Sequence, residues 1–361
     1  MENKQELRIA RRETRRACRK TVSRCNFSTT IYLIVASLAM TALITVISGI
    51  LGPELYEQVL QSPLYYNILL WSLQVVCMYL IGYPFFHLLT KHLPKRDISE
   101  KEKLGFGNFI GIFIMLEGVM LIGSIVANYV TELINKSLGI EVQDSTGDLI
   151  SQAPIGIIIL VVVIIGPIFE ELVFRKIFVD TIGKYSTSLA ILVSAASFAL
   201  FHGNITQIIY TFGAGLILAW VYAKTKRIIY PIIFHMLLNF FGSIPSMLIQ
   251  DSYNRIMAVP EESWESMMAD SAFMLDYMKV MAVTFMQYGF MFIGGIILIS
   301  MMLRRQFKID TTGEVKIGLF GRLGILVFNR GTLLFLVYTV ITVLSTLLLP
   351  LIEEYMNTLS T

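Results

Sequence analysis

The chain has 361 residues, of which 55% are hydrophobic and only 15% are charged, and its mean hydropathy is +0.68. A soluble protein of this length would carry far more charge. The composition therefore excludes an ordinary soluble globular protein and is typical of an integral membrane protein.

Nine apolar stretches meet or approach the length of about 20 residues that a helix needs to cross a bilayer core of about 30 Å. In chain order they are 30–52, 66–90, 106–131, 154–179, 187–202, 205–223, 229–249, 278–303 and 331–350. The stretch 187–202 is the shortest. We predict an all-α, polytopic membrane bundle of about nine transmembrane helices, or eight if that stretch does not cross.

Basic residues are concentrated in alternate loops. With nine spans and a cytoplasmic N-terminus, the cytoplasmic segments are 1–29, 91–105, 175–186, 224–228 and 304–330. These segments hold 26 of the 29 Lys and Arg residues, as the positive-inside rule requires. The net charge of +3 thus reports topology, and we expect no nucleic-acid partner.

We expect one integral domain embedded in a lipid bilayer, and favour a multi-pass protein of a bacterial plasma membrane. The first apolar run is long and follows a basic tail, so no cleavable signal peptide is expected. The predicted parts are a basic cytoplasmic tail (1–29), N-terminal transmembrane helices (30–153), a dense four-helix block (154–249), an acidic external loop (250–277), and C-terminal transmembrane helices (278–361) that include the basic loop 304–330. The sequence does not indicate an oligomeric state.

The unusual polar residues gather in the four-helix block, in three short sets. These are Glu170-Glu171-Leu172-Val173-Phe174-Arg175 on the fourth span, Phe198-Ala199-Leu200-Phe201-His202 at the end of the fifth, and His235-Met236-Leu237-Leu238-Asn239 on the seventh. An ionisable side chain at the centre of a bilayer costs about 2.5–3.5 kcal/mol or more, so such residues are usually functional. We take these sets as the candidate site.

Helix geometry divides the first set into two roles. Glu171 and Arg175 are four residues apart and share a face, so they can form a salt bridge. Glu170 lies about 100° round the helix from Glu171. One carboxylate is then neutralised and the other is free to face a cavity, which is what a general base needs.

The two histidine sets supply further polar groups. His235 and Asn239 are four residues apart on one face, where an imidazole and an amide can orient water, donate to an oxyanion or ligate a metal. Phe198 lies one turn before His202 and is expected to pack beside it. Gly203 follows at once, so His202 should lie at a helix end beside an irregular turn, which a membrane tolerates where the turn lines a cavity.

Together the three sets resemble the EExxxR, FxxxH and HxxxN motifs of the CAAX-protease and bacteriocin-processing family of intramembrane endopeptidases, also called CPBP or Abi. The resemblance covers about 165–245, with the motifs in the same order and each on its own span. It implies hydrolysis of a peptide bond in a membrane-associated peptide or protein substrate. Such substrates include CAAX tails and, in bacteria, peptides in maturation or bacteriocin self-immunity.

Carried over position by position, the resemblance implies a role for each residue. Glu170 would activate water together with His202, and His235 and Asn239 would stabilise the oxyanion. Glu171 and Arg175 would hold the site in shape.

Two mechanisms remain open. In the first, no cofactor is present and Glu170 acts as general base. In the second, Glu170, His202 and His235 bind a divalent metal such as zinc or cobalt. The sets lack the HExxH spacing of soluble zinc proteases, and a carboxylate held near Arg175 is a poor ligand. We therefore favour the glutamate mechanism.

Two functions without proteolysis are alternatives. The first is a catalytically silent scaffold or immunity protein that binds a toxin, a sensor kinase or an envelope enzyme. The second is a transporter, which the lack of an internal repeat disfavours. Because all six motif positions are kept, we favour an active enzyme.

Two further expectations concern position. At 1.5 Å per residue, His202 lies about 21 Å from the cytoplasmic end of its span, whereas Glu170 and His235 lie about 13 and 9 Å from theirs. We therefore expect the fifth helix to begin near Ile182 and to cross obliquely. Glu117, near the middle of the third span, is expected to make a helix–helix hydrogen bond, with a cavity or substrate contact as the alternative.

Overall fold

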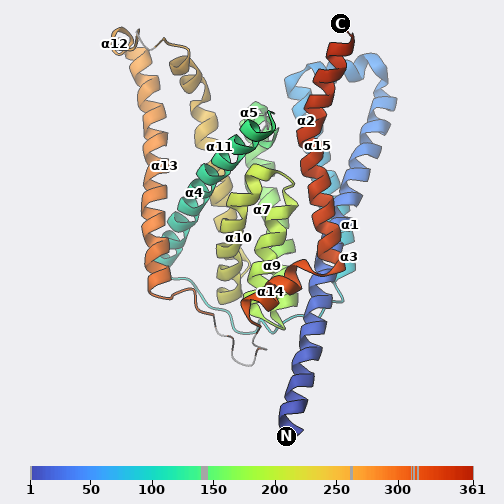
Figure 1. Ribbon diagram of the computed structural model, residues 1–361. Helices are drawn as coiled ribbons and strands as arrows, with labels where there is room; N and C mark the ends of the chain where they lie inside the picture. Colours follow the sequence, from blue (N-terminus) through green and yellow to red (C-terminus); the bar gives the residue numbers. More distant parts are fainter. Residues whose placement is uncertain are drawn as a thin grey trace.

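The computed structural model describes residues 2–139, 145–260, 263–309, 311, 314 and 317–360, and its regular elements are all helical (Figure 1). Within these residues, eight helices are long and apolar enough to cross a membrane. They are Ile9–Gln61, Pro63–Thr90, Phe106–Ser137, Ile155–Gly183, Ile205–Thr225, Ile229–Met257, Ser271–Leu303 and Arg330–Leu348. The expected polytopic helical bundle is confirmed.

Five of these crossings are single long helices, and a sixth is broken once. The single helices are α4 (Phe106–Leu138), α10 (Ile205–Thr225), α11 (Ile229–Met257), α13 (Ser271–Leu303) and α15 (Arg330–Ser360). Helix α1 (Glu2–Gln61) carries the basic tail directly into the first span. It is interrupted at Gly52, whose φ of 73° lies in the region that favours glycine, just before Pro53.

The other two crossings contain π-helical turns. The second span consists of α2 (Pro63–Gln74), η1 (Val75–Gly82) and α3 (Tyr83–Thr90). The fourth consists of α6 (Ile155–Ile158), η2 (Ile159–Ile165), α7 (Gly166–Glu171), η3 (Leu172–Val179) and α8 (Asp180–Gly183). Such widened turns are frequent at functional sites. Here they enclose the short α-helical turn that carries Glu170 and Glu171.

The short apolar stretch 187–202 forms α9 (Thr187–Phe201), which has 15 residues and is shorter than the eight crossing helices. Ser186 caps its start by accepting a hydrogen bond from the Leu189 amide. The chain then turns at Gly203, where φ is 60°, and Asn204 caps α10 by accepting from the Thr206 amide at 2.9 Å. Helix α9 therefore forms a tight antiparallel hairpin with α10.

The loops predicted to share the cytoplasmic side do lie together at one end of the bundle. Arg96 Nε is 3.1 Å from Asp180 Oδ1, and the Glu102 amide donates to the Thr225 carbonyl at 3.0 Å. The Thr187 amide donates to Glu314 Oε2 at 2.9 Å, which joins the loop after α13 to the same end. The structure thus agrees with the alternation that the basic residues predicted.

The polar segments between crossings are short in the structure. Residues 250–277 are divided among the end of α11, the single turn α12 (Trp264–Met267) and the start of α13, and Arg255 Nε lies 2.7 Å from Asp276 Oδ2. On the other side of the bundle, residues 319–327 form the amphipathic helix α14 (Leu319–Val327). Neither segment adds a separate folded domain.

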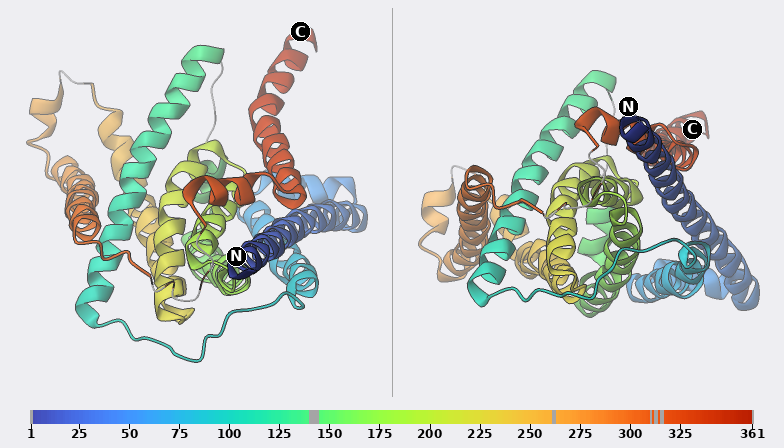
Figure 2. Two further views of the ribbon diagram at one scale, coloured as in Figure 1. Left: turned by 60° about the horizontal axis from the view of Figure 1, so that its bottom comes forward. Right: turned by 90° about the horizontal axis from the view of Figure 1, so that it is seen from below.

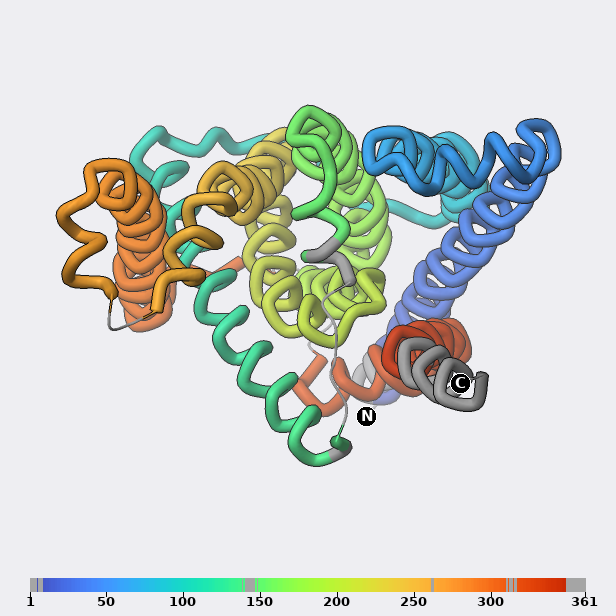
Figure 3. The backbone as a smooth tube through the Cα atoms, turned by 90° about the horizontal axis from the view of Figure 1, so that it is seen from above, coloured from blue at the N-terminus to red at the C-terminus, as the bar shows by residue number. Residues whose placement is uncertain are grey.

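The four-helix block occupies the centre of the molecule. Helices α4 and α13 flank it on one side, and α1, α2 and α15 flank it on the other (Figure 2, Figure 3). Helix α4 packs along both α10 and α13, while α1 packs along α15. The candidate site is therefore enclosed by helices from both ends of the sequence.

Candidate active site

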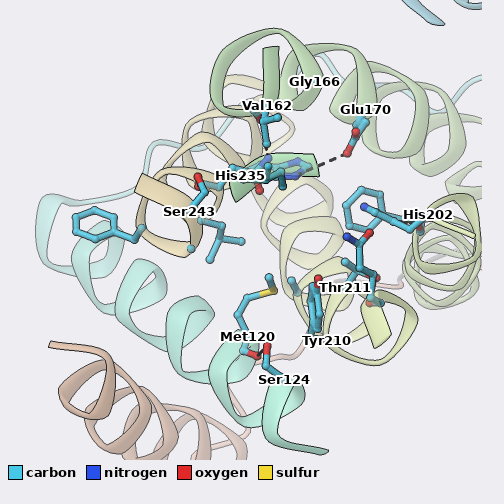
Figure 4. Close-up of a pocket in the computed structure, with 18 of the residues that line it drawn as sticks. Met120, Ser124, Val162, Gly166, Glu170, His202, Tyr210, Thr211, His235 and Ser243 are labelled. Carbon is cyan, nitrogen blue, oxygen red and sulfur yellow. Dashed lines mark hydrogen bonds and ion pairs between the residues drawn. The ribbon is translucent and has the colours of Figure 1, made fainter. Parts of the chain in front are cut away.

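A cavity of about 480 Å³ lies inside the central block. All four predicted catalytic residues line it, and they come from three separate elements: Glu170 on α7, His202 at the end of α9, and His235 and Asn239 on α11. Figure 4 shows Glu170, His202 and His235 directed toward one another across this space. The structure thus brings together residues that are up to 69 positions apart in the sequence.

The two adjacent glutamates have different surroundings. Glu171 is completely buried, and its Oε1 lies 2.9 Å from Arg175 Nη1, so the ion pair expected from the spacing is present. Glu170 keeps 19% of its side chain exposed, and its Oε2 lies 3.7 Å from His235 Nε2. That distance is too long for a direct hydrogen bond. Glu170 is therefore the carboxylate that faces the cavity.

The same Glu171 oxygen also orients a histidine. His235 Nδ1 lies 2.9 Å from Glu171 Oε1, the same oxygen that the Arg175 guanidinium contacts. A carboxylate only accepts hydrogen bonds, so His235 donates from Nδ1 and turns Nε2 toward Glu170 and the cavity. A carboxylate that fixes the tautomer of an imidazole is a common device in catalytic sites.

Phe198 lies at the centre of these groups. Its ring meets His202 at 4.9 Å and His235 at 5.5 Å between ring centroids, both edge to face at 89°. The Arg175 guanidinium lies over the same ring, 4.2 Å from its centroid. The ring therefore packs beside His202 as expected, and it also contacts His235 and Arg175.

His202 is oriented by its own helix. Its Nδ1 lies 2.8 Å from the Phe198 carbonyl oxygen, which can only accept, so Nδ1 carries the proton and Nε2 is left for other partners. The side chain is at the C-terminal end of α9, one residue before the turn at Gly203. A histidine at this irregular turn lines the cavity, as the sequence predicted.

Asn239 is held by an irregularity in the fourth span. Gly166 N–H bonds to the Val161 carbonyl, and Pro167 has no N–H, so the Val162 carbonyl lacks its usual helical partners. Asn239 Nδ2 donates to that carbonyl at 2.8 Å. The hydrogen bond satisfies the backbone and fixes the amide at the cavity wall.

For Glu170 and His202, the depth mismatch expected from the sequence is not removed by the early start that we predicted for the fifth helix. Helix α9 begins at Thr187, so an early start near Ile182 is wrong. Instead the fourth span continues through α8 to Gly183. Glu170 is then about 20 Å and His202 about 22 Å from the cytoplasmic ends of their helices, at 1.5 Å per residue. The length of the fourth span brings the two side chains level.

The flanking spans contribute wall residues that the motifs did not reveal. Tyr79, on η1, stacks on Phe169 with ring centroids 4.6 Å apart and lines the cavity close to Gly166. Gln74 lines it from the same span, and Gln207 and Ser243 line it from α10 and α11. A polar residue such as Gln74 inside an apolar stretch was the available signal.

Glu117 also lines the cavity, from α4. The residue is only 4% exposed, and its Oε1 has no hydrogen-bond partner among the described residues. The helix–helix hydrogen bond that we favoured from the sequence is thus not found for this oxygen. The alternative expectation, a position in the cavity, describes Glu117 in the structure.

The described residues contain no group of three or more His, Cys, Asp or Glu side chains placed to hold a metal ion. Both histidine Nδ1 atoms are engaged, with Glu171 and with the Phe198 carbonyl. A metal would have to be bound through the Nε2 atoms together with Glu170. These residue types are suitable ligands, but bringing them round an ion would require some rearrangement.

Comparisons with known proteins agree with the motifs. Residues 152–241 match the family described as type II CAAX prenyl endopeptidase Rce1-like. This segment of the chain therefore matches the Rce1-like (CPBP) family, and the resemblance seen in the three motifs is confirmed.

Two curated proteins are similar to this chain. One is the putative membrane peptidase YdiL of Bacillus subtilis, 31% identical over 162 residues, which are 43% of this chain and 63% of that protein. The other is the membrane-embedded CAAX protease MroQ of Staphylococcus aureus, 36% identical over 138 residues, which are 36% of this chain and 55% of that protein. The matched region thus spans less than two thirds of either relative. No solved structure matches this chain.

Proposed function

We propose that this protein is an intramembrane endopeptidase in which Glu170 activates the water that attacks a peptide bond. The observation that carries the proposal is the contrast between the two glutamates. Glu171 is fully buried and engaged by Arg175 and His235, whereas Glu170 faces the cavity with 19% of its side chain exposed. A carboxylate in an apolar cavity that is not neutralised by a cation suits a general base.

The reaction follows from the placement of these groups. Glu170, assisted by His202, accepts a proton from water while the water oxygen bonds to the carbonyl carbon of the substrate. The carbonyl oxygen becomes an oxyanion in this step. Glu170 then returns the proton to the amide nitrogen as the C–N bond breaks, which releases a carboxylic acid and an amine.

His235 and Asn239 are the proposed oxyanion donors. His235 is oriented by the Nδ1–H that it donates to Glu171, so Nε2 is the ring atom that faces the oxyanion and donates to it when it carries a proton. Asn239 uses one N–H of its amide for the Val162 carbonyl and has the other available for the oxyanion. Donors fixed before the reaction stabilise charge without reorganisation.

We further propose that the substrate is a peptide or protein segment at the membrane, reached within the bilayer of a bacterial plasma membrane. The location of the cavity among membrane-crossing helices supports this, because a bond cleaved there must enter the bundle. The names of the matched relatives refer to CAAX proteases and a membrane peptidase, which agrees with a peptide substrate.

The test is cleavage of a pool of quenched fluorescent peptides by purified protein in lipid nanodiscs. We expect Glu170→Gln to lower kcat/KM by about 10²- to 10⁴-fold, the usual contribution of a general base. Glu132→Gln is the matched control, since Glu132 is an exposed carboxylate on α4 paired with Lys136. Equal cleavage by the wild type and Glu170→Gln would overturn the peptidase proposal and favour a silent scaffold.

The metal-free mechanism has its own test. Elemental analysis of the active protein is expected to find no stoichiometric zinc or cobalt, and a chelator is expected to leave activity unchanged. One bound metal per chain, together with activity that a chelator removes and the metal restores, would establish the metal mechanism instead. Glu170, His202 and His235 would then be the ligands.

A further inference from the structure

The cavity contains a second carboxylate that the proposed reaction does not use. Glu117 lines the cavity from α4, is only 4% exposed, and its Oε1 has no partner among the described residues. A buried carboxylate oxygen without a partner is costly, and such groups are kept where a ligand supplies the missing interaction. Glu117 is therefore placed to bind something that the protein itself does not provide.

The charge of the cavity indicates what that ligand is. Among the described residues, the side chains that line the cavity include the two acids Glu117 and Glu170 but no Lys or Arg. The only lining groups that can become cationic are His202 and His235, which belong to the reaction centre. The part of the cavity near α4 thus has a potential negative charge without a countercharge.

Helix contacts fix the position of Glu117. The next residue, Gly118, packs so closely on α13 that a Cβ added there would come within 2.8 Å of the Gly294 Cα. Val119 reaches Gly213 of α10, where an added Cβ would lie 2.8 Å from Val119 Cγ1. Helix α4 is therefore fixed against both neighbours at this level, and Glu117 is held in a defined place.

Glu117 lies on the wall opposite the reaction centre. Figure 4 shows Met120 and Ser124 of the same helix across the cavity from Glu170 and His235. Met120 is three residues after Glu117, so the two side chains share a face of α4. A peptide held between the two walls would have its cleaved bond at Glu170 and a nearby side chain at Glu117.

We propose that Glu117 is a specificity residue that binds a Lys or Arg side chain of the peptide substrate, close in sequence to the cleaved bond. The proposal rests on the endopeptidase function proposed above. A substrate cation would neutralise the carboxylate and donate the hydrogen bond that Oε1 lacks. Aromatic residues that line the same cavity, such as Trp71 and Phe290, offer faces that also attract a cation.

The experiment uses the full-length protein in nanodiscs and a set of quenched fluorescent decapeptides. Each peptide carries Lys, norleucine or Glu at one position, scanned on both sides of the cleaved bond. Norleucine matches the length of the Lys side chain without its charge. At one position we expect the wild type to cleave the Lys peptide about tenfold to hundredfold better than the norleucine peptide in kcat/KM, the effect of a hydrogen-bonded charge.

Variants then assign this preference to Glu117. We expect Glu117→Gln to lower the Lys-to-norleucine ratio about tenfold at that position and Glu117→Lys to shift the preference toward Glu. The control Glu132→Gln should keep the wild-type ratio, because Glu132 lies outside the cavity on the same helix and is paired with Lys136.

Each outcome has a distinct meaning. A wild type that cleaves Lys and norleucine peptides equally at every position would overturn the proposal, whether or not the variants fold. A Glu117→Gln protein that loses activity on both peptides in the same ratio would show a structural role instead. Cleavage that is absent, or unchanged by Glu170→Gln, would overturn the peptidase function itself. A wild type that shows no Lys preference while Glu170 is still essential would overturn only the role of Glu117.

Discussion

The two walls of the cavity differ in how their polar groups are satisfied. On the reactive wall, formed by α7, the end of α9 and α11, each side chain that orients the site has at least one partner inside the protein, although Glu171 Oε2 has no hydrogen-bond partner among the described residues. Glu171, His202 and Asn239 are each bound, at 2.9, 2.8 and 2.8 Å from their partners. On the α4 wall, Glu117 Oε1 has no partner among the described residues.

The two walls also come from different parts of the sequence. The four proposed catalytic residues of the reactive wall, Glu170, His202, His235 and Asn239, fall within 152–241, the segment that matches the Rce1-like family, whereas Glu117 lies outside it. Groups that stabilise a transition state are most effective when they are fixed beforehand, but groups that recognise a substrate are satisfied only when it binds. The contrast suggests that the chemistry lies in the shared segment and the selectivity in the flanking helices.

The largest loss of stability is expected when Arg175, which contacts Glu171 on the reactive wall, is replaced. Arg175→Met leaves Glu171 as a buried carboxylate with His235 as its remaining partner, so we expect the free energy of unfolding to fall by about 3–5 kcal/mol. Chemical denaturation in detergent micelles would measure it. The matched control is Lys176→Met, whose side chain is 33% exposed and paired with Asp180, and a loss below about 1 kcal/mol is expected there.

A double variant sharpens this test. Replacing both members of a buried pair removes the uncompensated charge, so Glu171→Gln together with Arg175→Met should recover part of the lost stability. If Arg175→Met alone is as stable as the wild type, Glu171 does not depend on this ion pair and the reactive wall is not fixed in the way described.

Replacing Asn239 is expected to give the next largest loss in the free energy of unfolding. Asn239→Leu leaves the Val162 carbonyl without a donor, which should lower the free energy of unfolding by about 1–3 kcal/mol. It should also lower kcat by about 10²- to 10³-fold if the amide stabilises the oxyanion. Ser243→Ala, one turn further along α11, is the control for stability, since among the described residues its hydroxyl bonds the Asn239 carbonyl within the same helix and no other helix. A stability loss without any change in kcat would limit Asn239 to a positioning role.

The smallest loss of stability is expected for the hydrogen bond that joins α9 to the flanking helix α1. Ser197, next to Phe198 on α9, donates to Asn26 Oδ1 of α1 at 2.7 Å, and Asn26 Nδ2 lies 2.6 Å from Thr332 Oγ1 of α15. Ser197→Ala should lower the free energy of unfolding by about 1 kcal/mol. Ser194→Ala is its counterpart inside the block, because Ser194 donates to the Phe174 carbonyl at 2.8 Å.

The comparison of the two serine variants measures how strongly the flanking helices hold the site. Similar losses from Ser197→Ala and Ser194→Ala, measured by chemical denaturation, would show that α1 and α15 support α9 as firmly as the block itself does. No loss from Ser197→Ala would show that the reactive wall is held from within the block alone.

Much of the fold could be predicted from the sequence. The apolar stretches predicted all eight crossing helices, and the basic loops predicted which ends lie together, because the cost of burying polar backbone and charge in a bilayer acts on local sequence. The Glu171–Arg175 pair could also be predicted, since residues four apart on a helix are neighbours. The matching depths of Glu170 and His202 could not, because they depend on α8, which continues the fourth span to Gly183 beyond the apolar stretch 154–179.

The sequence by itself determined the membrane class, the alternation of the loops and the identity of the polar residues, because these depend on composition and on spacing within one helix. Only the tertiary structure decided that Glu171 bonds His235, that Asn239 bonds the Val162 carbonyl, and that Glu117 faces the same cavity as Glu170. Each of these contacts joins two helices, and the rotation and depth of one helix against another follow from packing along their whole length.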